Sequence, residues 1–272
     1  MPEYPEMEHY RERLSTLLGG QRIAGATVNR AASVNEPADR FESALVGRAV
    51  LYVERRGKHL LFHLDDGRRL VLHLMLGGWL FYGEHGPRPD SYFQVILAFG
   101  NGHSLYFGGL RLGYLHLLTA KAALERMKEL GPEPFDPRLT PEAFRELLRK
   151  KRSKLKTALT DQRFLAGIGN CYSDEICFDA KLHPALQANS LDEEQAGRLY
   201  RSIRKVLTEA KEAGGYMDRP LTEGDGTTGG YDERCKVYDR EGEPCEACGT
   251  PIRFESTAGR KMFYCPLCQP PA

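Results

Sequence analysis

The chain has 272 residues, of which 41% are hydrophobic and 28% are charged, and its formal net charge is +1. This composition is typical of a soluble protein with two modest domains, and the net charge gives no global argument for a polyanionic partner. The longest apolar stretches, such as residues 70–76, are too short to cross a bilayer, so we expect no membrane span and a cytoplasmic location.

The chain begins Met1-Pro2-Glu3. If Met1 is removed, Pro2 presents a secondary amine whose pKa starts at roughly 8, so a useful fraction is unprotonated at neutral pH. Such an amine can attack a sugar aldehyde carbon, and the resulting iminium acidifies the neighbouring C–H bond for elimination. Glu3 is a plausible proton donor and acceptor beside it. The alternative is that Pro2 only favours removal of Met1.

The first half of the chain predicts one helix followed by short strands. An amphipathic helix is expected from about Pro5 to Leu18, with Met7, Tyr10, Leu14, Leu17 and Leu18 on one face. Strands separated by Gly-, Asp- and Asn-containing turns are expected at 23–29, 49–56, 59–64, 69–74, 79–82, 92–98, 104–107 and 113–117. Many short antiparallel strands favour a sandwich or barrel.

The second half of the chain is predicted to be helical after a proline-rich linker at 131–138. Thr140 as N-cap and Pro141 at the first helical position predict one long helix through about Leu159. Further helices are expected at 169–180 and 192–213, followed by a Gly- and Thr-rich loop at 222–230.

Positive charge is concentrated in this half of the chain. The run Arg149–Arg152 is followed by Lys154 and Lys156, and further cations occur at Arg253, Arg260 and Lys261. Such clusters favour a local site for a polyanion. A solvated helix face is an equally good interpretation of the first run taken alone.

The last thirty residues contain two C-x-x-C pairs, Cys245 with Cys248 and Cys265 with Cys268. This spacing lets four thiolates reach one tetrahedral ion while the intervening segment closes a hairpin, so it predicts one structural zinc. Two disulfides or a redox pair are the alternatives. The remaining cysteines are an odd set that fits a reducing compartment, and we expect them to be buried: Cys171, Cys177 and Cys235.

Four motifs occur in order: P-E-x-P-E at the start, R-R-G-K at 55–58, A-G-I-G-N-x-Y-x-D-E at 166–175, and a cysteine segment ending in Y-C-P-x-C-Q. The glycine-rich segment alone is only a helix–turn–helix in which small residues let backbone amides approach an anion. Together the four motifs resemble the formamidopyrimidine-DNA glycosylase and endonuclease VIII family over essentially the full chain.

The resemblance implies a role for each matched residue. Pro2 would be the Schiff-base nucleophile, Glu3 the general acid and base, and Lys58 a catalytic-site cation near the phosphates that flank the lesion. Asn170 and Arg260 would hold the same DNA backbone, with His73 assisting. Weaker matches are Glu6, as a carboxylate that organises the site, and Lys156, as a lesion-contacting lysine.

The residues that fill the space of the flipped base depart from the family pattern. Leu76 stands at the position of a methionine, and Leu110 and Leu112 stand where arginine and phenylalanine are expected, although a one-residue shift would restore Arg111. A leucine can enter a base stack, but it cannot read the hydrogen-bonding edge of the partner base. We therefore expect weak discrimination of the opposite base.

The predicted fold class is α+β, an N-terminal antiparallel β-sandwich with a flanking helix, then a helix–two-turn–helix domain and a β-hairpin zinc finger. The expected domains are 1–130, 139–235 and 236–272. The expected function is base excision from damaged double-stranded DNA by a monomeric glycosylase and abasic-site lyase. Two alternatives remain: a catalytically weak or silent paralogue that binds damaged or abasic DNA, and a zinc-ribbon interaction module with an unrelated β-domain.

Overall fold

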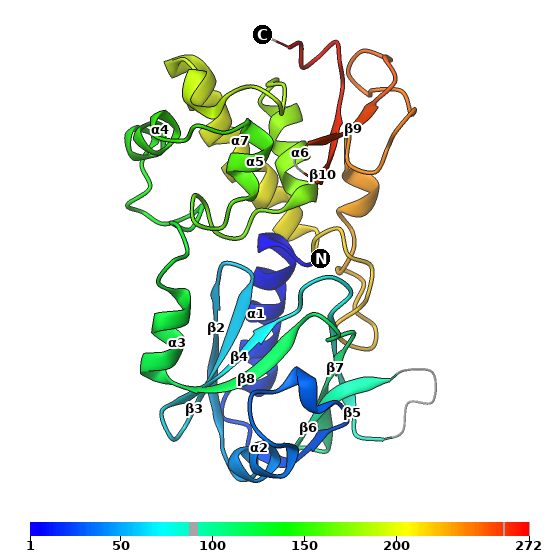
Figure 1. Ribbon diagram of the computed structural model, residues 1–272. Helices are drawn as coiled ribbons and strands as arrows, with labels where there is room; N and C mark the ends of the chain where they lie inside the picture. The colour runs from blue at the N-terminus through cyan, green and yellow to red at the C-terminus, as the bar shows by residue number, and fades with distance from the viewer. Residues whose placement is uncertain (87–91, 258, 272) are drawn as a thin grey trace. The chain divides into compact units, whose positions relative to one another are not determined.

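A computed structural model describes residues 1–86, 92–257 and 259–271 of the chain (Figure 1). Its contacts divide the chain into two compact units. Unit 1 comprises Met1–Lys128 and Lys211–Asp232, and unit 2 comprises Glu129–Ala210 and Glu233–Ala272. No helix in the described part of the chain is long and apolar enough to cross a membrane.

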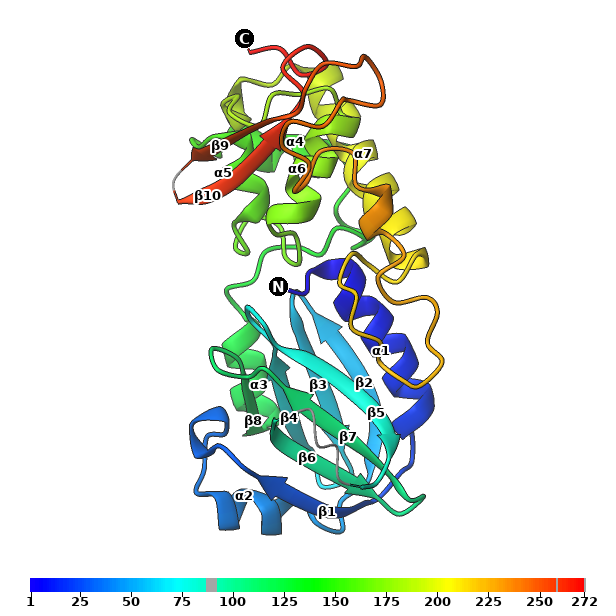
Figure 2. The same ribbon diagram turned by 90° about the vertical axis from the view of Figure 1, so that its right-hand side faces the viewer.

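Unit 1 contains two four-stranded antiparallel sheets that face each other (Figure 2). One has the strand order β1-β6-β7-β5 and the other the order β2-β3-β4-β8. The predicted strands are confirmed to within two residues at each end: β1 Ile23–Val28, β2 Val50–Arg56, β3 His59–Leu64, β4 Arg68–His73, β5 Trp79–Glu84, β6 Phe93–Phe99, β7 His103–Gly108 and β8 Tyr114–Thr119.

The core of unit 1 lies between these sheets. Phe62 of β3 and Phe107 of β7 meet across it, with ring centroids 6.4 Å apart. The predicted first helix is confirmed as α1, Tyr4–Leu18, which packs four of its apolar residues on the same core: Met7, Tyr10, Leu14 and Leu18. Apolar side chains that alternate along the strands, and those that recur every 3.6 residues along α1, thus pack in the same hydrophobic core.

Helix α1 also covers the outer edge of β2. The Ser15 hydroxyl donates to the Val53 carbonyl at 3.0 Å and accepts from the Val53 N–H at 3.2 Å. Val53 lies on the edge strand of its sheet, where these two backbone groups have no neighbouring strand to pair with. One helical side chain therefore satisfies both.

Two short helices of unit 1 were not predicted: α2, Ala38–Leu45, and α3, Ala120–Met127. Both are only eight residues long, which is shorter than the window of roughly 11–18 residues over which a helical apolar period can be recognised in a sequence. A signal for α3 was nevertheless present, because Thr119 precedes a run of good helix formers and its side chain accepts the Ala122 N–H at 3.2 Å. Short 3₁₀ turns, η1 at Ala31–Ser33 and η2 at Ala188–Ser190, were likewise not predicted.

Unit 2 consists of helices followed by a β-hairpin. The helices are α4 Pro141–Arg149, α5 Leu155–Thr160, α6 Asn170–Asp179 and α7 Glu193–Glu212; after a 3₁₀ turn, η3 Asp232–Arg234, the hairpin strands are β9 Arg253–Thr257 and β10 Arg260–Tyr264. The predicted helices at 169–180 and 192–213 and the predicted hairpin are confirmed. The last two residues of α7, Lys211 and Glu212, belong by their contacts to unit 1.

The prediction of one helix from Thr140 to Leu159 is wrong. The chain leaves the helical conformation after α4, and Lys154 has an extended ψ of 147°. The backbone there pairs with the segment after α6: Leu155 N–H donates to Leu186 O at 2.7 Å, and Lys156 N–H donates to Pro184 O at 2.8 Å. These tertiary hydrogen bonds replace the helical bonds, and periodicity alone could not reveal them.

The contacts give two compact units, whereas the sequence predicted three domains and a linker at 131–138. The segment Lys211–Asp232, assigned by sequence to the helical domain, packs with the β-sandwich. Tyr82 N–H donates to Leu221 O at 2.6 Å, and Leu221 is buried in the sandwich core. This returning segment supplies contacts to the N-terminus of the chain.

Candidate functional site

The second and third residues of the chain lie at the start of α1, and both are buried. Glu3 is the N-cap of the helix, and its N–H donates to Glu6 Oε2 at 2.7 Å in a capping box. The other carboxylate oxygen, Glu6 Oε1, accepts the Tyr216 N–H at 2.9 Å. Gly215 has φ +78°, and a Cβ there would overlap the Glu6 carboxylate. Glu6 therefore holds the start of the chain against the loop that contains Gly215.

Met1 determines whether Pro2 can react. Its amino nitrogen lies 3.2 Å from the Tyr216 hydroxyl, which also donates to the Met1 carbonyl at 3.3 Å. While Met1 is attached, the Pro2 nitrogen is an amide and is not nucleophilic. Hydrolysis of this peptide bond creates a secondary amine next to Glu3.

The R-R-G-K motif forms the turn between β2 and β3, and its first arginine joins that turn to α1. Arg55 Nε lies 2.5 Å from Glu8 Oε2, and the Arg55 guanidinium lies 4.2 Å from the centroid of the Tyr4 ring. Burial opposes the charge of Glu8, but Arg55 and Arg11 together hold the Glu8 pKa below its usual range. The turn is thus fixed to the helix that carries Glu3.

Lys58 lies in the β2–β3 turn, next to His59, whose strand partner on β4 is His73. Lys58 is only 5% exposed, and it follows Gly57, whose φ of +56° makes the turn. His73 pairs with His59 across β3 and β4, with ring centroids 4.3 Å apart. Burial lowers the pKa of His73 to about 4, and the Lys58 charge acts in the same direction. At neutral pH the imidazole is therefore uncharged, and its buried Nδ1 has no hydrogen-bond partner in the described part of the chain.

The two loops that carry the departures from the family pattern touch each other. A Cβ on Gly109 would overlap the carbonyl oxygen of Gly77, so both backbones are in close contact. Leu76 is 67% exposed and Leu112 is 63% exposed, one on each loop. Arg111 is also exposed.

Leu110 does not share this exposure, and its predicted place on a DNA-facing surface is wrong for this structure. It is fully buried in the core of unit 1. Its N–H donates to Gln94 Oε1 at 2.9 Å, and its carbonyl accepts from the Ser33 hydroxyl at 3.2 Å. Leu110 anchors the loop, while Arg111 and Leu112 form its outer surface.

In unit 2, Lys156 is not at the surface, which contradicts the lesion-contacting role expected for it. Its side chain and that of Asp174 are both 0% exposed, and Lys156 Nζ lies 2.7 Å from Asp174 Oδ1. Lys156 Nζ also donates to the Asn170 carbonyl at 2.7 Å. Asn170 is the first residue of α6, and its buried Oδ1 has no partner among the described residues. Lys156 thus holds the position of Asn170.

The acidic residues Asp174 and Glu175 attach α6 to the zinc-finger segment. Asp174 Oδ2 accepts the Phe263 N–H of β10 at 3.2 Å. The Glu175 carboxylate accepts the N–H groups of residues 236, 237 and 238 at 2.8–2.9 Å. Burial raises the pKa of both carboxyls, that of Asp174 to about 7. Arg260, at the start of β10, is partly exposed on the hairpin that these contacts hold.

The four cysteines of the predicted zinc site lie together. Their sulfur atoms are all within 4.8 Å of one another; Cys245 Sγ is 3.9 Å from Cys268 Sγ, and Cys248 Sγ is 3.5 Å from Cys265 Sγ. Four thiolates at the usual Zn–S distance of about 2.3 Å would be separated by about 3.8 Å in a tetrahedron. The donor set therefore fits one structural zinc ion. The three remaining cysteines are buried, as predicted.

Sequence reasoning missed the residues that hold these groups in place. Gly215 and Tyr216 are far from Glu6 in sequence, and no local pattern connects them. Asp174 and Glu175 stood inside the A-G-I-G-N-x-Y-x-D-E motif, but we assigned them no function. A signal was available, since two acids inside an otherwise apolar helical segment need partners when they are buried.

Comparison with known proteins agrees with this arrangement. Family models match the formamidopyrimidine-DNA glycosylase N-terminal domain at residues 1–114, the formamidopyrimidine-DNA glycosylase H2TH domain at 130–219, and the zinc finger found in FPG and IleRS at 242–271. An antiparallel sandwich, a helix–two-turn–helix unit and a four-cysteine hairpin therefore occur in the order typical of one class of DNA-repair enzymes.

Full-length relatives make the assignment specific. The chain is 37% identical to the formamidopyrimidine-DNA glycosylase of Pelotomaculum thermopropionicum, over 99% of both chains, and 39% identical to that of Heliobacterium modesticaldum, over 99% of this chain and 100% of the relative. The chain belongs to the formamidopyrimidine-DNA glycosylase family.

Solved structures show the same fold. The Lactococcus lactis FPG mutant G226P in complex with Fapy-dG-containing DNA matches with a TM-score of 0.90 at 32% identity, over 99% of this chain and 100% of that one. The MutM (FPG) protein from Thermus thermophilus matches with a TM-score of 0.85 at 38% identity, over 98% of both chains. The predicted fold class is confirmed.

Proposed function

We propose that the protein is a bifunctional DNA glycosylase and abasic-site lyase that removes a damaged base from duplex DNA. The family, the names of the relatives and the DNA in several solved neighbours support this function. The observation that carries it in this chain is the Glu6 carboxylate, which accepts the N–H groups of both Glu3 and Tyr216 and so holds the residue next to Pro2 in one place.

The first chemical step is attack of the Pro2 nitrogen on C1′ of the damaged nucleotide. The C1′–N glycosidic bond breaks, its electron pair leaves with the base, and the base takes up the proton that the Pro2 amine loses. Glu3 protonates the ring oxygen as the O4′–C1′ bond breaks, which leaves an iminium between Pro2 and the opened sugar. Zinc has only a structural function in this scheme.

The iminium then drives strand cleavage. It acidifies the C2′–H bond, a base removes that proton, and the C3′–O bond breaks with the 3′ phosphate leaving. Glu3 lies next to Pro2 in the chain and is the group of this site that can return a proton to the sugar or accept one from it. Elimination therefore follows excision on the same covalent intermediate.

DNA has to be held open for this chemistry. Extruding a nucleotide from the stack costs a few kcal/mol, and phosphate contacts stabilise the bent backbone. In our proposal Lys58 and His73 of unit 1, and Asn170 and Arg260 of unit 2, contact the phosphates. Leu76 and Leu112 of the two touching loops enter the gap left by the extruded base.

The oligomeric state and the cellular location of the protein follow from the same features. We expect a monomer, because one chain carries both the amine and the DNA-binding units. A cytoplasmic location fits three buried cysteines outside the zinc set, an odd number typical of reducing compartments.

Reductive trapping tests the function directly. The protein with Met1 removed should form a borohydride-stable covalent complex with a duplex that contains an abasic site, and Glu3→Gln should lose base excision more than cleavage of a preformed abasic site. If the amine is acetylated chemically, trapping should disappear. A catalytically silent DNA-binding paralogue would bind the abasic duplex and form no complex with it.

A further inference from the structure

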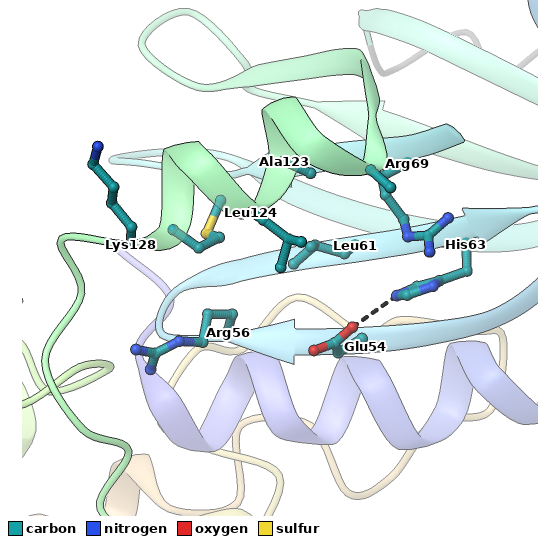
Figure 3. A pocket seen from close by; sticks show the side chains of 10 residues that line it. Glu54, Arg56, Leu61, His63, Arg69, Ala123, Leu124 and Lys128 are labelled. Atoms are coloured by element: carbon teal, nitrogen blue, oxygen red, sulfur yellow. Dashed lines mark hydrogen bonds and ion pairs between the residues drawn. The ribbon is translucent and has the colours of Figure 1, made fainter. Parts of the chain in front are cut away.

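A pocket of about 380 Å³ opens on the outer face of the β2-β3-β4-β8 sheet, beside α3 (Figure 3). Leu61, an outward-facing residue of β3, forms its floor together with the side of α3, and polar or charged side chains stand around the opening: Glu54, Arg56, His63, Arg69 and Lys128. The volume is within the range of about 300–1,000 Å³ that is usual for ligand pockets. None of the residues assigned above to catalysis, DNA or zinc lines it.

The apolar side of this pocket is a stripe of α3 that the sheet covers only in part. Ala120, Ala123, Leu124 and Met127 follow the spacing i, i+3, i+4 and i+7, so they share one face of the helix. Ala123 and Met127 are buried, but Leu124 is 73% exposed. The two alanines leave the space between helix and sheet open, and Leu124 stands at its rim without a core to pack in.

The charges at the opening favour an anion. Arg69 donates to the carbonyl oxygens of Gly67 at 2.9 Å and Arg68 at 3.0 Å, which hold the guanidinium without neutralising it. Glu54 Oε2 lies 2.7 Å from His63 Nε2, within hydrogen-bonding distance. The acid is thus directed to the histidine, as Figure 3 shows, while Arg69 faces the pocket.

An aromatic surface continues the pocket along β2. The Tyr52 ring stacks on the His63 ring, with centroids 3.9 Å apart, and Tyr52 is 49% exposed. Tyr52 and Glu54 alternate onto the same outer face of the strand, opposite His63 and Leu61 of β3. The surface is therefore a short groove that is apolar in the middle, and its margins carry three cations, Arg56, Arg69 and Lys128, and one carboxylate, Glu54.

We propose that this groove binds an acidic peptide segment of a partner protein, which inserts one apolar side chain between Leu61 and Leu124 and places its carboxylates against Arg69 and Arg56. A peptide fits better than nucleic acid because the floor of the pocket, formed by Leu61 and the apolar face of α3, is apolar. It fits better than a small anion because exposed Leu124 and Tyr52 extend the apolar surface beyond the pocket. Binding here is independent of the Pro2 chemistry.

Fluorescence anisotropy of labelled hexapeptides tests the proposal on the whole protein. The probes are five aspartates around one phenylalanine, leucine or isoleucine, and the same peptide with serine at that position. At least one apolar peptide should bind below about 1 mM, the serine peptide should bind at least tenfold more weakly, and affinity should fall with salt. Leu124→Ser and Arg69→Glu should each weaken binding by at least about tenfold, roughly 1.4 kcal/mol.

Matched controls are available at and beside α2 of the same unit. Val46 is an exposed apolar residue and Arg40 an exposed arginine, so Val46→Ser and Arg40→Glu repeat both chemical changes away from the groove. They should leave peptide affinity unchanged, and excision of a damaged base should be the same in all four variants. Failure of all three apolar peptides to bind, equal binding of the serine peptide, or tighter binding of benzoate or a single-stranded oligonucleotide would each overturn the proposal.

Discussion

Lys156 Nζ and Asp174 Oδ1 lie 2.7 Å apart in the interior of unit 2, and neither side chain is exposed. The lysine holds the Asn170 carbonyl at the start of α6, and the aspartate holds the N–H of Phe263 in β10. This ion pair therefore connects two elements that carry proposed phosphate-binding residues.

Breaking this pair should destabilise the protein strongly. Lys156→Met leaves a buried carboxylate without a cation, and the loss of one partner of a buried pair typically costs about 3–5 kcal/mol. The double variant Lys156→Met with Asp174→Leu should be less destabilised than Lys156→Met alone, as measured by urea unfolding. If the double variant were the less stable one, Asp174 would stabilise the protein through contacts other than its ion pair with Lys156.

The same pair predicts a pH dependence. Burial raises the pKa of Asp174 to about 7, against the lowering effect of Lys156. Because this is above the unfolded value of ~4, the contribution to stability is complete below ~pH 4 and is lost as the pH rises through about 7. Removing Lys156 raises the pKa further, so the free energy of unfolding of Lys156→Met should fall more steeply above neutral pH. An unchanged slope would contradict this assignment.

Gly215→Ala should disable the amine without unfolding the chain. The new Cβ would overlap the Glu6 carboxylate, and the backbone there has φ +78°. We expect the rate of borohydride trapping on abasic DNA to fall by at least about tenfold, which corresponds to about 1.4 kcal/mol in the transition state. Gly226→Ala is the matched control, since a Cβ at Gly226 meets open space. Equal trapping by both variants would show that Glu6 does not position Pro2.

Removing one zinc ligand should release the metal and disorder the hairpin. Cys265→Ser leaves three thiolates, and structural zinc contributes roughly 10–16 kcal/mol of apparent binding free energy to such small units. Zinc content by mass spectrometry and affinity for an abasic duplex should both decrease. Cys235→Ser, at a buried cysteine outside the cluster, should retain the metal. Full DNA affinity in a zinc-free variant would exclude the hairpin from the DNA-binding surface.

Acid should weaken unit 1 through the adjacent histidines His59 and His73. Burial lowers the pKa of His59 to about 3 and that of His73 to about 4. Because the unfolded value is about 6.5, their contribution to stability is present above ~pH 6.5 and is lost as the pH falls toward 4. His59→Gln should reduce this loss, as followed by urea unfolding at several pH values. A loss of the same size in the variant would locate the acid sensitivity elsewhere.

The opposite base should have little effect on excision. Leu76 and Leu112 can fill the gap in the stack but offer no hydrogen bonds, so we expect less than the roughly 1–3 kcal/mol that one good base contact confers. Excision rates of one lesion opposite A, C, G and T measure this. A strong preference for cytosine that disappears in Arg111→Ala would show that Arg111, exposed on the same loop, reads the partner base.

The sequence predicted the elements that repeat a short pattern. Alternation located the eight strands, the helical period located α1 and α7, and the two C-x-x-C pairs located the zinc site. Each depends on residues a few positions apart, where chain geometry dictates which side chains share a face.

The wrong predictions concern features that depend on contacts between residues far apart in the sequence. The break between α4 and α5 depends on backbone hydrogen bonds to residues 184–186, and the burial of Lys156 depends on a carboxylate eighteen positions away. Leu110 and Leu112 are both apolar and two residues apart, yet one is in the core and the other is exposed. Both lie in the turn that follows Gly109, whose φ is +67°, and composition cannot distinguish the two environments.

The contact between Ser15 and Val53 has a consequence for behaviour in solution. An edge strand with unpaired backbone groups can add a strand from another molecule and so begin self-association. By accepting from and donating to the same residue, the Ser15 hydroxyl occupies the place that an incoming strand would need. Ser15→Ala should therefore leave enzyme chemistry intact and shorten the time for which a concentrated preparation stays free of aggregates.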